Sequence, residues 1–138
     1  MKSLLIASLL WAFAGLAHGA CTQDTLTGDW ALEIAAINGG EITAVAGIVN
    51  FDGVKKVKIV QARIHTLGFR SPAVTGGGTY TVKANCMVTF TINLRQTGEK
   101  FIIDGALVSP SEMKIAASQQ DELLMVSAAG EAKKLTGL

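Results

Sequence analysis

The chain has 138 residues, of which 49% are hydrophobic, and its 12 lysines and arginines nearly balance 11 aspartates and glutamates. This length suits one domain with a core of ordinary size. The charge balance gives no reason to expect nucleic acid or an anionic membrane surface as a partner.

The first 20 residues are typical of a secretory signal peptide. Lys2 precedes an apolar run, SLLIASLLWAFAGLA, that is short for a membrane span, and the small-residue stretch AHGA follows it. Cleavage after Gly19 or Ala20 would leave a domain of residues 21–138 with a net charge near zero, because Lys2 leaves with the peptide. The chain has no N-x-Ser/Thr sequon, which favours a bacterial secreted or periplasmic protein.

The two cysteines, Cys21 and Cys86, are expected to form a disulfide, because exported proteins meet an oxidising compartment. Such a bond would tie the start of the mature chain to the rest of the domain. The alternative is a lipoprotein anchored through an acylated Cys21, with Cys86 left unpaired. The residues HGA before Cys21 lack the leucine-like residue that usually stands three places upstream of a lipidated cysteine.

Eight short apolar or alternating segments follow, and turn residues separate them. The predicted strands span about 28–37, 42–51, 54–64, 79–83, 86–95, 100–108, 112–118 and 122–129. We interpret the glycine run 76–78 as a flexible loop between strands. Short strands at even spacing predict an all-β domain, either a single antiparallel eight-stranded barrel or a two-sheet β-sandwich. An eight-stranded barrel is filled by side chains or holds one small ligand.

The turn sequences predict which side chains point inward. A two-residue turn at Asp52-Gly53 would place Phe51 opposite Val54. Alternation from that turn places one set of residues on the inner face and leaves Lys56 and Lys58 in solvent. The inner set is Ala44, Ala46, Ile48, Val57, Ile59 and Gln61, continued by Arg63 and His65. A three-residue loop at 83–85 would likewise bring Tyr80 and Phe90 to the inner face.

Two stretches carry a resemblance to a known group of barrels. GIVNFDGVKKV (47–57) and GTYTVKANCMVTFTI (78–92) resemble small secreted bacterial proteins of the allene oxide cyclase or dirigent type, which are calycin-like barrels. GDW at 28–30 is similar to the Gly-x-Trp of lipocalin and avidin barrels. The resemblance covers about a third of the chain and consists of turn and strand residues, so it implies a fold more than a function. Met87 and Val88 depart from the pattern, where smaller residues are expected.

Reaction motifs are few. After the signal peptide the sequence contains one histidine, His65, and no Gly-x-Ser-x-Gly elbow, so Ser-His-Asp chemistry has little support. No HExxH, CxxC or EF-hand spacing predicts a metal site. We therefore expect no metal and no cofactor, and no catalytic residue is assigned.

The candidate ligand-binding residues are those predicted to face inward. The small side chain of Ala46 would leave space opposite Ile59, and Arg63 would hold a polar head together with His65 or Tyr80. The alternative is that Gln61, Arg63 and His65 form a solvated rim. The candidate set is Trp30, Ala46, Ile59, Gln61, Arg63, His65, Tyr80 and Phe90.

Three functions are compatible with these observations. The first is a secreted binding module for a small apolar ligand with a polar head. The second is a structural or envelope scaffold whose barrel is filled. The third, which the resemblance implies, is a cyclase or isomerase of the allene oxide cyclase type that works by shape and exclusion of water.

Overall fold

The computed structural model describes residues 20–38, 41–119 and 127–137. Residues 1–19 of the predicted signal peptide lie outside the described residues. In the described part of the chain, one short 3-10 helix precedes nine strands. The helix is η1 (Gln23–Leu26), and the strands are β1 (Gly28–Asn38), β2 (Glu41–Phe51), β3 (Lys56–Thr66), β4 (Phe69–Arg70), β5 (Val74–Val82), β6 (Met87–Leu94), β7 (Lys100–Ser109), β8 (Glu112–Gln119) and β9 (Ser127–Lys134).

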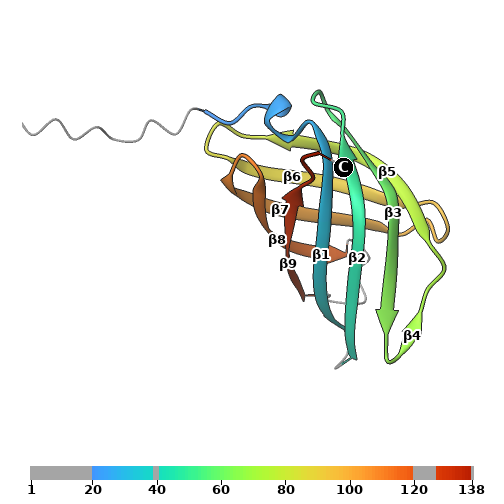
Figure 1. The fold of residues 1–138 in the computed structure, drawn as a ribbon. Coiled ribbons are helices and arrows are strands. Elements are labelled where there is room, and N and C mark those ends of the chain that lie inside the picture. The colour runs from blue at the N-terminus through green and yellow to red at the C-terminus, as the bar shows by residue number, and fades with distance from the viewer. Residues whose placement is uncertain (1–19, 39–40, 120–126, 138) are drawn as a thin grey trace, which may run out of the picture.

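Eight of the strands form one closed antiparallel barrel (Figure 1). The hydrogen-bonded order is β2-β1-β9-β8-β7-β6-β5-β3, and a further pairing of β2 with β3 closes the sheet. The two-residue strand β4 pairs only with the end of β3 and extends the β3 hairpin. The predicted eight-stranded barrel is confirmed, and the sandwich alternative is wrong.

Six of the predicted strands agree with the observed bounds to within two residues. The other two need correction. The final strand was predicted at 122–129 but lies at Ser127–Lys134, and residues 120–126 are outside the described part of the chain. The glycine run was predicted to be a loop, whereas residues 76–78 lie inside β5, between β3 and β6.

The glycines of β5 are required by the close approach of β6. A Cβ atom on Gly78 would lie 1.7 Å from the backbone oxygen of Thr91, and one on Gly76 would lie 2.2 Å from that of Asn93. No side chain fits at these distances. The run therefore lets the sheet bend tightly at this corner of the barrel, a common use of glycine inside strands.

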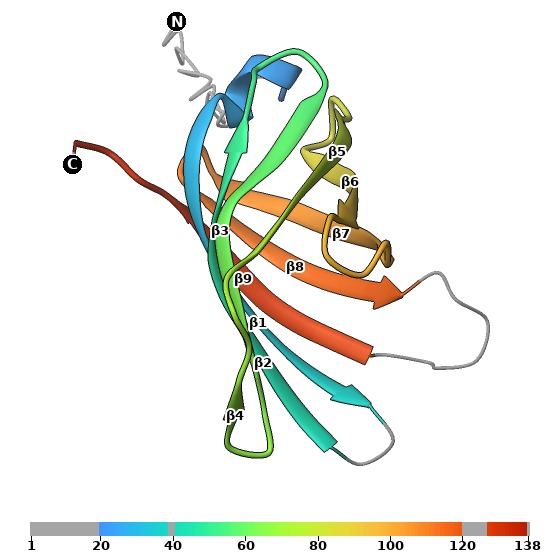
Figure 2. The same cartoon turned by 90° about the vertical axis from the view of Figure 1, so that its right-hand side faces the viewer.

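The end of the barrel at which β1 begins and β2 ends is sealed, and we call it the closed end. Helix η1 lies across it (Figure 2), and Leu26 is completely buried. The indole N–H of Trp30 donates a hydrogen bond to the Leu26 carbonyl over 2.8 Å. The side chain of Gln23 donates to the Val54 carbonyl over 2.7 Å and accepts from the N–H of Val82.

A disulfide between Cys21 and Cys86 fixes the start of this segment to the turn before β6, with a Cα–Cα distance of 5.0 Å. The predicted bond is confirmed. The bond occupies the sulfur atom of Cys21, which would carry the lipid in the lipid-anchored alternative. The left-handed residue in this turn is Cys86, with φ of 66°. Tyr80 and Phe90 are buried in the interior, as predicted, and Val88 is buried with them.

The β2–β3 register differs from the prediction because the turn is longer. Phe51 pairs with Val57, not with Val54, and residues 52–55 form the connection. The Asp52 carboxylate holds this turn, because it accepts hydrogen bonds of 2.8 Å from the backbone N–H groups of Val54, Lys55 and Lys56.

The longer turn changes which residues of β2 point inward. Val49 and Phe51 are buried, with 1% of each exposed. Ala44 and Ala46 are exposed and Ile48 is half-buried. The prediction that these three residues lie on the inner face is therefore wrong.

A β-bulge then inverts the alternation in the middle of β3. Val57 and Ile59 face inward, and Lys56 and Lys58 face solvent, as predicted. Ile59 pairs with Val49 but Gln61 pairs with Ile48, so Val60 is an extra residue in β3. Both Val60 and Gln61 are exposed, which is the usual effect of a bulge on the side-chain pattern.

Beyond the bulge the inward residues of β3 are Ala62 and Ile64. Ala62 is 5% exposed, and Ile64 packs against the core. The predicted inward placement of Gln61, Arg63 and His65 is therefore wrong. A one-residue change of phase moves every following side chain to the other face of the sheet.

The turn at Asp52 leads to a prediction about acid stability. The N–H groups of Lys56 and Val54 hold the pKa of the Asp52 carboxyl below its ordinary value of 3.8. A lowered pKa in the folded state stabilises the fold above pH 3.8, and this contribution is lost as the pH falls further. We expect the melting temperature of the natural protein to fall more steeply in this acid range than that of Asp52→Asn. Melting temperatures are measured by circular dichroism at each pH. If those of the two proteins fall equally as the pH is lowered, this role of Asp52 is contradicted.

Candidate functional site

The barrel contains a cavity of about 100 Å³. It lies toward the end of the barrel at which β1, β3 and β6 end, and we call this the open end. The cavity is lined by Leu32, Ile34, Ala36, Val45, Gly47, Val49, Ile59, Ala62, Ile64, Val74, Ile92, Leu94, Phe101, Ile103 and Ala128.

Every residue that lines the cavity is apolar. Val45, Ile64 and Phe101 line the cavity in the open half of the barrel and are only half-buried. Their partial exposure indicates that the cavity is reached from this end. Such a cavity recognises a ligand by shape and by burial of apolar surface, with a gain of about 25 cal/mol for each Å².

Of the predicted site residues, Ile59 lines this cavity. Trp30, Tyr80 and Phe90 point inward but pack together at the closed end, with at most 1% of each exposed. The Tyr80 hydroxyl donates a hydrogen bond to the Gln23 carbonyl over 3.1 Å. Burial raises the pKa of Tyr80, and the negative charge of Asp52 raises it further. The polar groups of Trp30 and Tyr80 thus already have partners within the protein.

The other four predicted site residues lie on the outer surface. Ala46 and His65 share a shallow groove across β9, β1, β2 and β3. Gln61 is exposed, and the half-buried Arg63 donates from Nη1 to the Ser71 carbonyl over 3.4 Å. None of the four lines the cavity. The fold therefore does not bring Ala46 and Arg63 to the cavity, and the predicted site does not form there.

Several cavity residues could have been found from the sequence. Leu32, Ile34 and Ala36 share the alternation of Trp30 in the stretch WALEIAAI, so an inward Trp30 places them inward as well. No local signal identifies Val45, Ala62 or Ile64, because their inward position depends on the length of the turn at Asp52 and on the bulge at Val60.

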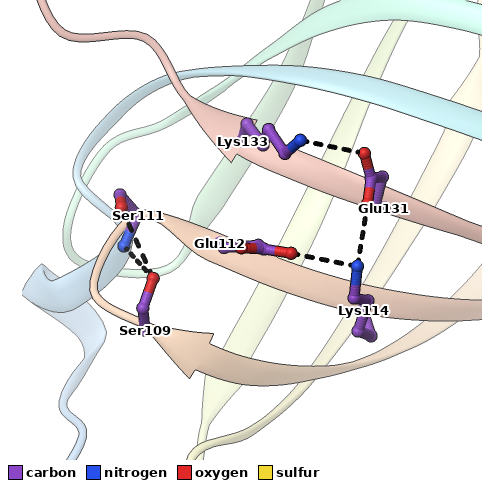
Figure 3. A network of polar contacts seen from close by, with 6 residues as sticks. All are labelled: Ser109, Ser111, Glu112, Lys114, Glu131 and Lys133. Carbon is purple, nitrogen blue, oxygen red and sulfur yellow. Dashed lines mark hydrogen bonds and ion pairs between the residues drawn. The ribbon is translucent and has the colours of Figure 1, made fainter.

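A charged network covers part of the outer face of β8 and β9 (Figure 3). Lys114 Nζ lies 2.9 Å from Glu112 and 2.8 Å from Glu131, and Lys133 lies 3.2 Å from Glu131. The hydrogen bond from Lys114 lowers the pKa of Glu131, and the same contact raises the pKa of Lys114. These charges are paired with one another, so the network is part of the solvated surface and not a binding site.

Neither a metal-binding cluster nor a long apolar helix occurs in the described residues. Across 20–38, 41–119 and 127–137, no three His, Cys, Asp or Glu side chains are grouped so as to hold a metal ion. Within those same ranges there is no helix with the length and apolar character that a membrane crossing requires.

No family model and no curated protein matches the chain. Solved structures do share the fold. A redesigned β-barrel, mFAP1, bound to DFHBI, is 17% identical with a TM-score of 0.58, over 82% of this chain and 98% of that chain. A structure from the de novo design of transmembrane β-barrels is 14% identical with a TM-score of 0.61, over 78% of this chain and 94% of that one.

A natural protein has the same architecture. The S-type phycobiliprotein lyase from Guillardia theta is 6% identical with a TM-score of 0.53, over 84% of this chain and 92% of that chain. Likenesses at these levels of identity concern the fold alone. They agree with the closed eight-stranded barrel that the sequence predicts, and none of the structures named here is an allene oxide cyclase or a dirigent protein.

Proposed function

We propose that this protein is a secreted barrel that binds a small apolar ligand in the cavity near its open end. The observation that carries the proposal is the wholly apolar cavity of about 100 Å³, inside a barrel whose opposite end is packed and cross-linked. The mFAP1 barrel, which shares this fold, is bound to DFHBI. This supports the proposal that a barrel of this architecture can hold a small ligand.

The volume limits the ligand. Pockets for drug-sized molecules measure about 300–1,000 Å³. A dry cavity of about 150 Å³ lined by Leu, Ile and Phe holds benzene. A volume of about 100 Å³ therefore suits a small hydrocarbon group or the end of an aliphatic chain. A polar head would stay outside at the open end, because none of the described residues that line the cavity has a polar side chain.

Two other functions receive less support. A scaffold with a filled barrel does not account for the empty apolar volume. A cyclase or isomerase of the allene oxide cyclase type, together with membership of that group, rests on the turn and strand motifs at 47–57 and 78–92. None of the described residues that line the cavity has an ionisable side chain, so with these residues such an enzyme would act by shape and exclusion of water.

Export is the second part of the proposal. It is supported by the signal-like residues 1–20 and by the pairing of the two cysteines. The oxidising conditions outside the cytoplasm are those in which such a bond persists.

The ligand proposal is tested by filling the cavity. Ala36 lines the cavity and is 7% exposed, whereas its neighbour Ala35 points outward. Ala36→Leu should occupy the space from within, and Ala35→Leu adds the same group on the outside. We expect benzene and 1-octanol to shift the methyl NMR signals of Ile59 and Ile64 in the natural protein and in Ala35→Leu. Ala36→Leu should weaken the binding of both by at least about tenfold, or 1.4 kcal/mol.

The same spectra contain the result that would refute the proposal. If neither probe shifts these methyl signals in the natural protein, the cavity does not take up ligands. If Ala36→Leu binds as well as Ala35→Leu, binding occurs elsewhere. Thermal melting of both variants checks folding, and a filled cavity should leave the melting temperature equal or higher. Native mass spectrometry of the protein purified from its source would then search for the natural ligand.

A further inference from the structure

Large apolar side chains are exposed at the tips of two hairpins at the open end. Ile37 and Ile42, on either side of the β1–β2 connection, are 59% and 67% exposed. Leu67 and Phe69, in the β3–β4 hairpin, are 67% and 80% exposed. Phe69 is thus an aromatic ring with most of its surface in water, and three further large apolar side chains are exposed at the same end of the barrel, which calls for an explanation.

The strand register brings the two tips side by side. Ile37 and Ile42 are direct partners across β1 and β2. Thr43 pairs with Thr66, and their hydroxyl oxygens lie 2.9 Å apart. The β3–β4 hairpin therefore starts beside the beginning of β2, and both hairpins project from the same end of the barrel, opposite η1 (Figure 2). Together Ile37, Ile42, Leu67 and Phe69 form what we call the tip cluster.

Two arginines, Arg63 and Arg70, lie beside the tip cluster, on the side toward the barrel. His65 pairs with Arg70 across the β3–β4 hairpin, and Arg63 is the next residue on the same face of β3. Among the described residues, neither Arg63 nor Arg70 forms an ion pair with an acidic side chain. Glu41, at the start of β2, is the acidic residue of these hairpins that lies nearest the tips, and Glu33 and Asp29 lie further back on β1.

The positive charge of Arg63 and Arg70 distinguishes between two partners for the tip cluster, a second copy of the chain and an anionic bilayer. In a two-fold contact between copies, the cluster would meet itself and bring Arg63 and Arg70 near the same arginines of the second copy. An anionic bilayer offers both an apolar interior for the tips and phosphate groups for the guanidinium groups. The overall charge balance predicted no such partner, but the local charges at these hairpins favour one.

We propose that the open end is a membrane-docking surface. Leu67 and Phe69 enter the boundary between headgroups and acyl chains, Ile37 and Ile42 lie against it, and Arg63 and Arg70 bind lipid phosphates. Docking in this orientation turns the mouth of the cavity toward the bilayer. The inference goes beyond the proposed ligand binding and does not require it.

Vesicle binding tests the proposal. We expect the protein to float with vesicles of equal parts phosphatidylcholine and phosphatidylglycerol, more weakly with phosphatidylcholine alone, and less as salt is added. Replacing Leu67→Ser and Phe69→Ser together should reduce the affinity by more than about tenfold, because two large apolar side chains no longer enter the bilayer. Arg63→Gln with Arg70→Gln should remove most of the preference for phosphatidylglycerol.

The closed end provides a matched control. Val54 and Val108 are 66% and 56% exposed there, so Val54→Ser with Val108→Ser removes two exposed apolar side chains, of smaller size, away from the tips. This pair should bind vesicles as the natural protein does. Hydrogen exchange locates the contact, because vesicles should protect the amides of residues 65–70 and leave those of 52–55 unchanged. All variants carry the same N-terminus, so any contribution of residues 1–19 is common to them.

Three results would overturn the proposal. One is equal vesicle binding by the Leu67→Ser, Phe69→Ser protein and its closed-end control. Another is protection of residues 52–55 instead of 65–70. The third is a concentration-dependent dimer that the same tip substitutions abolish, which would make a second copy the occupant of this surface.

Docking and ligand uptake can fail independently. Ala36→Leu should lose benzene uptake and still bind vesicles. The Leu67→Ser, Phe69→Ser protein should lose vesicle binding and still show benzene shifts at Ile59 and Ile64.

Discussion

Phe51→Ala should lower the free energy of unfolding by about 3–5 kcal/mol, the range for removal of a buried aromatic side chain. Phe51 is 1% exposed and stands at the centre of the closed end. Its ring meets those of Trp30, Tyr80 and Phe90 edge to face, at centroid distances of 6.4, 4.9 and 5.6 Å. Each such pair contributes about 0.5–1.5 kcal/mol beyond the burial of area. Urea unfolding followed by circular dichroism measures the loss.

Phe69→Ala is the matched control, since it makes the same chemical change at a ring that is 80% exposed. Its effect on stability should stay within about 0.5 kcal/mol. Similar losses for the two variants would show that Phe51 does not organise the closed end. The pair also separates the two roles of aromatic residues in this chain: Phe51 stabilises the barrel, whereas Phe69 belongs to the proposed docking surface.

The barrel could be predicted because its signals are local. Turn residues separate the segments, and alternation within each segment defines a strand, so six strands were located to within two residues. The glycine run 76–78 was assigned to a loop because glycine usually weakens strands. Its place in β5 depends on the distance to the β6 backbone, which no local pattern contains.

The site was harder to predict because it depends on register. Asp52-Gly53 fits a two-residue turn, but the Asp52 carboxylate binds three successive N–H groups and stabilises a longer one. That difference turned Ala46 outward. The bulge at Val60 then turned Arg63 and His65 outward, although Ile59 was placed correctly. Such a bulge arises from the fit of β3 between β2 and β5, and this fit cannot be seen in β3 alone.

The disulfide is the other feature with a large expected effect. Cys86→Ser should lower the free energy of unfolding by about 4 kcal/mol, because the bond closes a loop of 65 residues in the unfolded chain. Far-UV circular dichroism should keep its strand signal, since the ladders of the eight barrel strands do not involve Cys21. Helix η1 should also stay in place, held by burial of Leu26 and by the hydrogen bonds of Gln23.

The backbone at Cys86 supplies an internal control. Its φ of 66° lies in the left-handed region, which glycine adopts without strain. Cys86→Gly should therefore be more stable than Cys86→Ser by about 1 kcal/mol, while both lack the bond. Cys21→Ser removes the same bond and leaves Cys86 unchanged, so it should match the effect of a reducing agent on the natural protein.

Intact mass of the protein purified from its source tests the bond and the proposed export together. We expect an N-terminus at Ala20 or Cys21 and a mass lower by two hydrogens than that of the reduced chain. A diacyl or triacyl group on Cys21 would contradict both the disulfide and the secreted location, because the same sulfur cannot carry a lipid and bond to Cys86. In that case Cys21→Ser would release the protein from the membrane, whereas with the disulfide present it changes only stability.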